Sequence, residues 1–379
     1  MRRPRLIAPA THPVAYYHCV SRVVNRDFVL GDAERDQLVE YMRIYERFGG
    51  LRVISYCIMS NHFHILVEVP QRPDDADLPN DTALVAKVQA TLGDKSAVAL
   101  EWELAHFRGQ GNHEAAEALR EKWFSRMWNV SAFMKVLKQR FSQWFNGRHA
   151  RRGTLWEDRF RSVLVEGRGQ ALRAMAAYID LNPVRAKICD DPKDYRWCGY
   201  AEAIAGGKEA REAVEFLVSL NPHGGLKPQL AFPSSPVPAI SRSPNSRRSN
   251  LPPKEALRRW RCHLFGIPEQ AERQRNEAAK GDRADIYRDR IPRDKALEVL
   301  ARGGKLSEAD YLRCKVRYLS DGAAIGGKDF VNELFATFRE RFGPKRKDGA
   351  RPLRGLAADP SHPADRLFNL RQLRKSVFS

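Results

Sequence analysis

The clearest pattern in the chain is a pair of apolar runs joined by a short polar segment, at residues 53–69. Both runs are rich in valine, isoleucine, leucine and aromatic residues, which is typical of buried β-strands. Side chains alternate between the two faces of a strand, so His62 and His64 share one face and Phe63 and Ile65 the other. Two imidazoles on one face can hold a metal ion if a third ligand joins them. With ten histidines in the chain, this spacing also arises by chance.

Further strands and helices surround this pair. Residues 15–22 are rich in aromatic and β-favouring residues and predict a first strand. Residues 32–48 have apolar residues at helical spacing and are followed by two glycines, which predicts a helix. Later, residues 131–145 predict a helix, 155–166 a strand and 170–181 a helix with an apolar stripe. This order predicts an α+β fold, with an antiparallel sheet and helices packed on one face.

Composition divides the chain into parts. Residues 1–220 hold the predicted sheet, interrupted at about 70–130 by a helical insertion that opens with a loop rich in proline and aspartate. Residues 221–253 contain eight prolines together with serine, asparagine and arginine, so they predict a linker. Residues 254–342 predict an all-α domain, and residues 343–379 form a basic tail.

The predicted C-terminal domain contains a pattern compatible with a helix-turn-helix. Ser307 and Asp310 resemble a capping box at the start of a helix that runs to Tyr318. Residues 320–322 then predict a turn, and residues 329–342 a second helix. Two helices joined by a glycine-containing turn in a basic domain are compatible with DNA binding. The same pattern is also common in helical domains that bind nothing.

The charge of the chain favours a polyanionic partner. There are 65 Lys and Arg residues against 46 Asp and Glu, giving a formal net charge of +19, and nucleic acid is the usual partner of such a protein. An anionic membrane is the alternative, but no apolar run approaches the length of a membrane span, so we expect no membrane contact. The six cysteines form no Cys-x-x-Cys pair, which argues against a zinc ribbon and fits a reducing cytoplasm.

Four stretches together resemble the REP-associated tyrosine transposases, a group of single-tyrosine HUH transposases in which U stands for a hydrophobic residue. The stretches are Tyr-His-Cys-Val-Ser-Arg at 17–22, Met-Ser-Asn-His-Phe-His-Ile-Leu-Val at 59–67, Gly-Thr-Leu-Trp at 153–156 and Tyr-Ile-Asp-Leu-Asn-Pro-Val-Arg-Ala at 178–186. The resemblance covers about residues 14–200, apart from the insertion. It implies a ferredoxin-like antiparallel sheet, the HUH nuclease fold.

The resemblance also implies roles for individual residues. His62 and His64 would hold Mg²⁺ or Mn²⁺, with Asn182 as a third ligand. Tyr178 would attack a phosphodiester of single-stranded or hairpin DNA and form a 5′-phosphotyrosine linkage, leaving a free 3′-hydroxyl that can later rejoin the strand. Such an enzyme would work in the cytoplasm at the nucleoid, as a monomer or a homodimer. The candidate DNA-binding residues are Arg22, Arg26, Arg159, Arg161 and Arg185.

Each of these roles has a structural alternative. A tyrosine beside the apolar stripe of a helix is commonly a half-buried packing residue, and an asparagine before proline commonly ends a helix. The arginines can equally be surface charges. For the whole protein, two other functions remain: a DNA-binding protein that keeps the fold without catalysis, and a different metallohydrolase that uses the histidine pair on nucleic acid.

Overall fold

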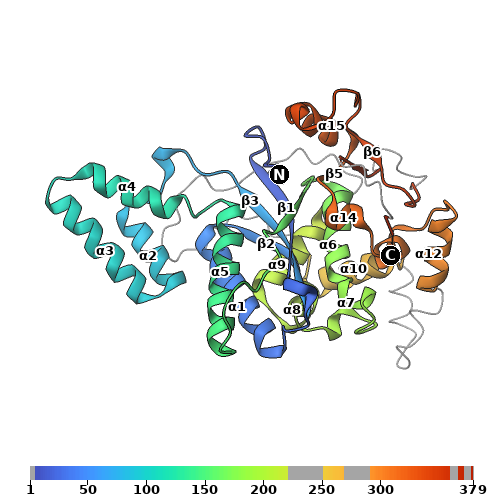
Figure 1. Ribbon diagram of the computed structural model, residues 1–379, viewed down its shortest axis with the longest axis horizontal. Helices are drawn as coiled ribbons and strands as arrows, with labels where there is room; N and C mark the ends of the chain where they lie inside the picture. Colours follow the sequence, from blue (N-terminus) through green and yellow to red (C-terminus); the bar gives the residue numbers. More distant parts are fainter. Residues whose placement is uncertain (1–4, 221–250, 269–290, 359–365, 371–376, 379) are drawn as a thin grey trace.

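The computed structural model describes residues 5–220, 251–268, 291–358, 366–370 and 377–378. A seven-stranded sheet with the order β2-β3-β1-β4-β5-β7-β6 runs through the molecule (Figure 1). The strands are β1 Val14–Arg22, β2 Arg52–Ile58, β3 His62–Pro70, β4 Arg161–Val165, β5 Ala324–Gly326, β6 Arg351–Pro352 and β7 Phe368–Asn369. No helix in the described ranges is both long and apolar enough to cross a membrane.

The first four strands form an antiparallel sheet of ferredoxin-like order. β3 pairs with both β1 and β2, and β4 pairs with the other edge of β1. Helix α1, Asp32–Gly49, connects β1 to β2, and helix α5, Val130–Arg148, precedes β4. Gly50 ends α1 in the left-handed conformation, with a φ of 63°, which glycine adopts without steric cost. The predicted α+β class and antiparallel sheet are confirmed.

Alternation along the strands creates two hydrophobic cores. Cys19, Phe63 and Ile65 point to the face covered by α1 and α5, whereas Cys57 and Leu66 point to the opposite face. That second face is covered by α6 Gly169–Asp180, α8 Gly199–Ala205 and α9 Lys208–Ser219, and α10 Pro253–Phe265 packs on α9. Helices therefore lie on both faces of the sheet rather than on one, because the apolar stripe of α6 also needs a surface on which to bury.

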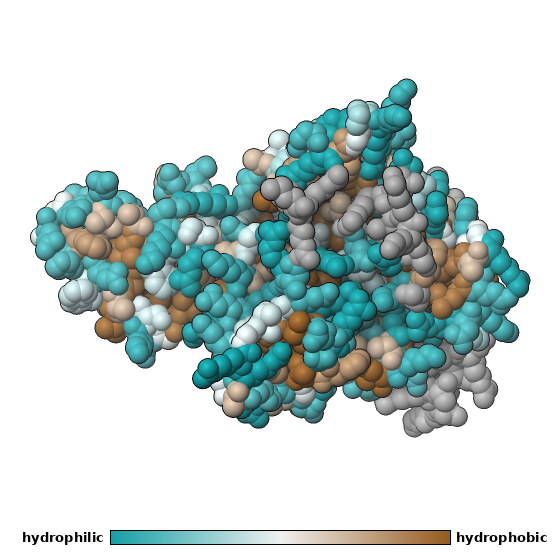
Figure 2. Space-filling model, in the orientation of Figure 1, coloured by the Kyte–Doolittle hydropathy of each residue, from teal (hydrophilic) through white to brown (hydrophobic). Residues whose placement is uncertain are grey.

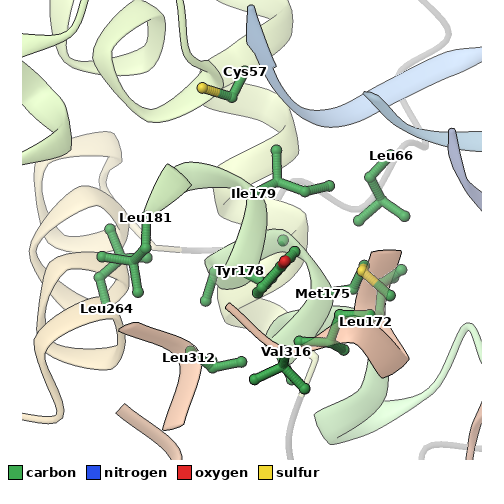
Figure 3. Close-up of a cluster of buried hydrophobic side chains, with 14 of the residues drawn as sticks. Cys57, Leu66, Leu172, Met175, Tyr178, Ile179, Leu181, Leu264, Leu312 and Val316 are labelled. Atoms are coloured by element: carbon green, nitrogen blue, oxygen red, sulfur yellow. The ribbon is translucent and has the colours of Figure 1, made fainter. Parts of the chain in front are cut away.

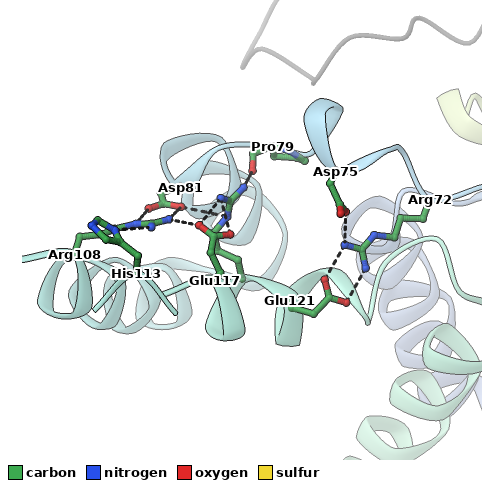
Figure 4. Close-up of polar contacts among 9 residues, drawn as sticks. Arg72, Asp75, Pro79, Asp81, Arg108, His113, Glu117 and Glu121 are labelled. Carbon is green, nitrogen blue, oxygen red and sulfur yellow. Dashed lines mark hydrogen bonds and ion pairs between the residues drawn. The ribbon is translucent and has the colours of Figure 1, made fainter. Parts of the chain in front are cut away.

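The insertion is a separate helical unit that extends away from the sheet (Figure 1). It consists of α2 Asp81–Leu92, α3 Asp94–Gly109 and α4 His113–Phe124, and its small hydrophobic core also includes Phe48 from α1. Ion pairs join its helices: Arg108 bridges Asp81 and Glu117, and Arg72 binds Glu121 (Figure 4). Hydrophobic surface is visible on this unit in Figure 2.

The C-terminal region departs from the all-α prediction, because part of it extends the sheet. Its helices are α12 Arg293–Ala301, α13 Glu308–Arg313, α14 Arg317–Asp321 and α15 Lys328–Thr337. β5 lies between α14 and α15 and pairs in parallel with β4, so these helices are not joined by the short turn of a helix-turn-helix. A three-residue strand is too short to show an alternating pattern in the sequence.

Other predicted boundaries shift for local reasons. Ser307 caps α13 through the backbone N–H of Asp310, as predicted, but the helix ends at Arg313 rather than at Tyr318. The strand predicted at 155–166 is regular only in β4, while Trp156 makes an isolated bridge with Val23. Short 3-10 helices lie at Val24–Arg26, Asp75–Asp77, Pro192–Asp194 and Arg339–Arg341. Most of the predicted linker lies outside the described residues.

Candidate active site

The candidate catalytic residues meet on the face of the sheet that α6 covers. His62 and His64 point from β3 to this face, and their ring centroids lie 5.1 Å apart. Tyr178 comes from the last turn of α6, with its ring centroid 6.3 Å from that of His64. Asn182 begins the next short helix, α7 Asn182–Arg185, and its amide nitrogen lies 3.5 Å from His62 Nε2. The fold therefore brings together residues that are more than 100 positions apart in the sequence.

The two histidines each have one ring nitrogen engaged by a neighbour. His62 Nδ1 lies 2.6 Å from the side-chain oxygen of Asn61, and His64 Nδ1 lies 2.8 Å from His18 Nε2. Since an amide oxygen only accepts, His62 Nδ1 carries the donated proton, and the lone pair of Nε2 faces the amide nitrogen of Asn182 at 3.5 Å. Within the described ranges, no three His, Cys, Asp or Glu side chains are grouped to hold a metal. The available donor set is two imidazoles and one amide.

Burial keeps these imidazoles neutral. The pKa of His62 is lowered to about 3, chiefly by burial and further by the positive charges of Arg22, Lys315 and Arg185. Burial also lowers the pKa of His18 to about 4 and that of His64 well below its ordinary value. A neutral imidazole is the form that ligates metal ions, so the pair is ready for a divalent cation at neutral pH. Two nitrogens with an amide oxygen favour Mn²⁺ over Mg²⁺.

The Asn182 side chain is oriented by Arg185. Arg185 Nη2 donates to Asn182 Oδ1 at 3.2 Å, so the amide nitrogen faces His62. An amide binds a metal ion through its oxygen. The side-chain amide of Asn182 would therefore have to flip, so that Oδ1 instead of Nδ2 faces His62, before it could act as a ligand. Arg185 also donates to the carbonyl of Leu312 at 3.0 Å, which ties this group to the C-terminal region.

Tyr178 is covered in this conformation. Its exposed fraction is only 2%, and Leu312 and Val316 from the C-terminal region lie in the same buried cluster (Figure 3). On another side, the guanidinium carbon of Arg185 lies 3.8 Å from the centroid of the Tyr178 ring. Tyr178 has almost no exposed surface in this conformation, so its surroundings must move before DNA can reach the phenol.

The five arginines predicted to bind DNA have different positions. Arg22 lies opposite His62 in the pairing of β1 with β3, beside the site, and Arg26 is exposed in the following turn. Arg161 begins β4 and forms an ion pair with Asp321 at 2.8 Å, whereas Arg159 is exposed and precedes the strand. Arg185 is not a surface residue: it is 6% exposed and lies inside the site, because its guanidinium is held by Asn182 and Leu312.

His18 is a member of the site for which the sequence pattern predicted no role. It is fully buried and lies between His64 and the C-terminal region, since its Nδ1 is 2.7 Å from the carbonyl oxygen of Leu319. A sequence signal exists: His18 stands in a strand whose antiparallel pairing with β3 places it diagonally across from His64. The pairing register is needed to see this relationship.

The comparisons with known proteins place the first part of the chain in context. Residues 11–78 match the family model described as "Transposase IS200 like". The matched stretch contains β1, β2 and β3, and with them His62 and His64, while Tyr178 lies beyond it. The match confirms the predicted resemblance to transposases of this kind.

Among solved structures, the chain is similar to that of a REP-associated tyrosine transposase bound to a REP hairpin. The TM-score is 0.35 and the sequence identity 13%, and the similarity covers 55% of this chain and 87% of the other. No curated protein matches the chain.

Proposed function

We propose that this protein is a metal-dependent transposase that cleaves and rejoins single-stranded hairpin DNA through a 5′-phosphotyrosine intermediate at Tyr178. The observation that carries the proposal is the meeting of Tyr178 with His62, His64 and Asn182 on one face of the sheet. The transposase family match over the strands that hold the histidine pair supports it. DNA, single-stranded or hairpin, would be the partner, and the cytoplasmic nucleoid the place of action.

The residues of the site have complementary tasks in this reaction. The phenol oxygen of Tyr178 forms a bond to phosphorus while the bond from phosphorus to the 3′-oxygen breaks, and the phenol proton passes to that 3′-oxygen, which leaves as the 3′-hydroxyl. The positive guanidinium of Arg185 over the tyrosine ring stabilises negative charge that develops there. His62, His64 and the turned amide of Asn182 would hold Mg²⁺ or Mn²⁺, which neutralises a phosphate oxygen when bound.

The surface around the site carries positive charge for the strand. Arg22 and Lys315 both lie close enough to His62 to lower its pKa, and neither has an ion-pair partner in the described part of the chain. We propose that they contact phosphates, as does the exposed Arg26. Arg159 and Arg161 remain candidates, the latter only if its ion pair with Asp321 opens.

The burial of Tyr178 favours a second candidate function, a DNA-binding protein without catalysis. The two functions differ in a covalent-adduct assay. Labelled single-stranded hairpins from the DNA flanking the gene are incubated with the protein, with and without Mn²⁺, and separated on a denaturing gel. The transposase predicts a metal-dependent, slowly migrating adduct; the binding protein predicts shifted but uncut DNA on a native gel. Metal-dependent cleavage that survives Tyr178→Phe would instead indicate a metallohydrolase.

A further inference from the structure

We infer that His18 is a positioning residue that fixes which ring nitrogen of His64 faces the metal site. The inference rests on the proposed function in one respect: it takes His64 to be a metal ligand. Two linked hydrogen bonds determine the tautomer of His64. They begin at a backbone carbonyl of the C-terminal region, pass through His18 and leave the lone pair of His64 on Nε2.

Both hydrogen bonds are short. His18 Nδ1 lies 2.7 Å from the carbonyl oxygen of Leu319, and His18 Nε2 lies 2.8 Å from His64 Nδ1. The exposed fraction is 0% for His18 and 4% for His64, so water does not compete for these bonds. β1 and β3 are paired along their whole length, which holds the two rings at a fixed separation of 5.0 Å between centroids.

The direction of each bond follows from its acceptor. A carbonyl oxygen only accepts, so His18 Nδ1 must carry the proton that lies between it and Leu319. A neutral imidazole has one N–H, so His18 Nε2 has none and accepts a hydrogen bond. His64 Nδ1 must then be the donor. Since His64 is also neutral, its Nε2 has no proton and presents a free lone pair.

The opposite arrangement requires a buried charge. If His18 Nε2 donated to His64 Nδ1, His18 would carry a proton on both nitrogens and thus a positive charge. Its ring is completely buried, away from the water that would stabilise such a charge, and no carboxylate of the described residues is hydrogen-bonded to it.

The neighbouring ligand reaches the same state by another route. His62 Nδ1 donates to the side-chain oxygen of Asn61, so His62 also presents Nε2. Two different acceptors, a histidine nitrogen and an amide oxygen, thus select the same tautomer in both candidate ligands. Outer partners of this kind orient ligating histidines and raise their basicity. The hydrogen bonds that orient His64 run through His18 to the carbonyl of Leu319 on α14. The C-terminal region therefore takes part in forming the site.

The direct test is the tautomer of His64 in the full, metal-free chain. With ¹⁵N-labelled histidine, two-bond nitrogen–proton correlations distinguish an Nδ1–H from an Nε2–H imidazole. We expect Nδ1–H for His64 at pH 7. An Nε2–H tautomer in the unmodified protein would overturn the inference whatever the variants do.

Two variants then separate positioning from packing. His18→Phe keeps a buried ring but removes the acceptor, and we expect loss of the pure Nδ1–H state and a fall in Mn²⁺ affinity of about 10–100-fold. His18→Gln offers an amide oxygen near the position of Nε2 and is expected to restore most of that affinity. His263→Phe, a histidine replacement on α10, is the matched control and is expected to change neither readout. Equal Mn²⁺ affinity in His18→Phe and the unmodified protein would contradict the inference.

Failure of the proposed metal site has a different signature. If His62→Ala leaves Mn²⁺ binding unchanged, the metal site itself is wrong, and only the tautomer measurement still bears on His18. If His62→Ala weakens binding but His18→Phe does not, the metal site stands and the positioning role falls. Calorimetric titration with Mn²⁺ supplies both comparisons without DNA or turnover.

Discussion

The guanidinium of Arg185 lies over the aromatic ring of Tyr178, 3.8 Å from its centroid, and the same side chain donates to Asn182. Arg185 is 6% exposed, and no ion pair within the described residues neutralises it. Burial lowers the pKa of Arg185, because a charged guanidinium loses its hydration inside the protein. Arg185 is thus a buried cation that contacts both the proposed nucleophile, Tyr178, and a proposed metal ligand, Asn182.

Replacing this cation is expected to slow adduct formation. Arg185→Gln removes a desolvated cation–π contact of about 2 kcal/mol, which corresponds to roughly a 30-fold lower rate if the contact acts mainly on the attacking phenolate. The measurement is the rate of adduct formation at saturating DNA, with thermal unfolding as a check on the fold. Arg196→Gln removes an equal charge from an exposed position and serves as the control. Equal rates in the two variants would contradict this role.

Loosening the cover over Tyr178 is expected to have the opposite effect on the rate. Val316 is completely buried beside the tyrosine, and Val316→Ala is expected to destabilise its packing by about 1–3 kcal/mol. We propose that this segment moves when DNA reaches Tyr178, so adduct formation should become several-fold faster. Val88→Ala makes the same change in the core of the insertion and should leave the rate unchanged. A slower reaction in Val316→Ala, with no change in Val88→Ala, would contradict this prediction. It would show that the packed segment supports the reaction instead of blocking it.

The histidine pair predicts a specific loss of metal binding. His62→Gln removes one of the two imidazoles, and we expect Mn²⁺ affinity to fall at least tenfold, with adduct formation recovering only partly at high Mn²⁺. His12→Gln, which changes a histidine paired with Glu333 outside the site, is the control. Titration calorimetry of both variants makes the comparison. Unchanged affinity in His62→Gln would exclude this residue as a ligand.

A buried carboxyl under the site predicts a pH dependence of stability. Asp180 accepts hydrogen bonds from Ser55 and Trp260, both at 2.9 Å, yet burial raises its pKa to about 7 from 3.8. The folded protein therefore holds a proton that the unfolded chain releases between these values. The stabilisation from this group is complete below pH 3.8 and is lost as the pH rises through about 7.

Denaturant unfolding of Asp180→Asn isolates this contribution. Between pH 5 and pH 8, the difference in unfolding free energy between the unmodified protein and the variant is expected to fall by roughly 1–3 kcal/mol. A difference that does not depend on pH would show that Asp180 has an ordinary pKa in the folded protein.

Local patterns in the sequence predicted most of the elements, because strands and helices near the N-terminus are long and strongly patterned. The predicted helix at 32–48 and strand at 15–22 differ from α1 and β1 by one residue at an end. Alternation along β3 also predicted that His62 and His64 share a face. These features depend on neighbours in the sequence.

Features that depend on distant contacts were not predictable in this way. β5 is three residues long, and only its pairing with β4 makes it a strand. Arg185 is predicted from the sequence as a DNA-binding residue, and its burial is not predictable because its partners, Asn182 and Leu312, are brought around it by folding. The role of His18 requires the register of β1 on β3 and the carbonyl of Leu319, which is 301 positions away.

The central claim is that Tyr178 forms a covalent bond with DNA, and mass spectrometry of the adduct tests it most directly. The protein is incubated with hairpin DNA and Mn²⁺, treated with nuclease and digested with trypsin, which releases the peptide from Ala174 to Arg185 with Tyr178 as its only tyrosine. We expect this peptide to carry a nucleotide linked through a 5′-phosphate, and Tyr178→Phe to yield none. A nucleotide on another residue, or cleaved DNA without any modified peptide, would contradict the account.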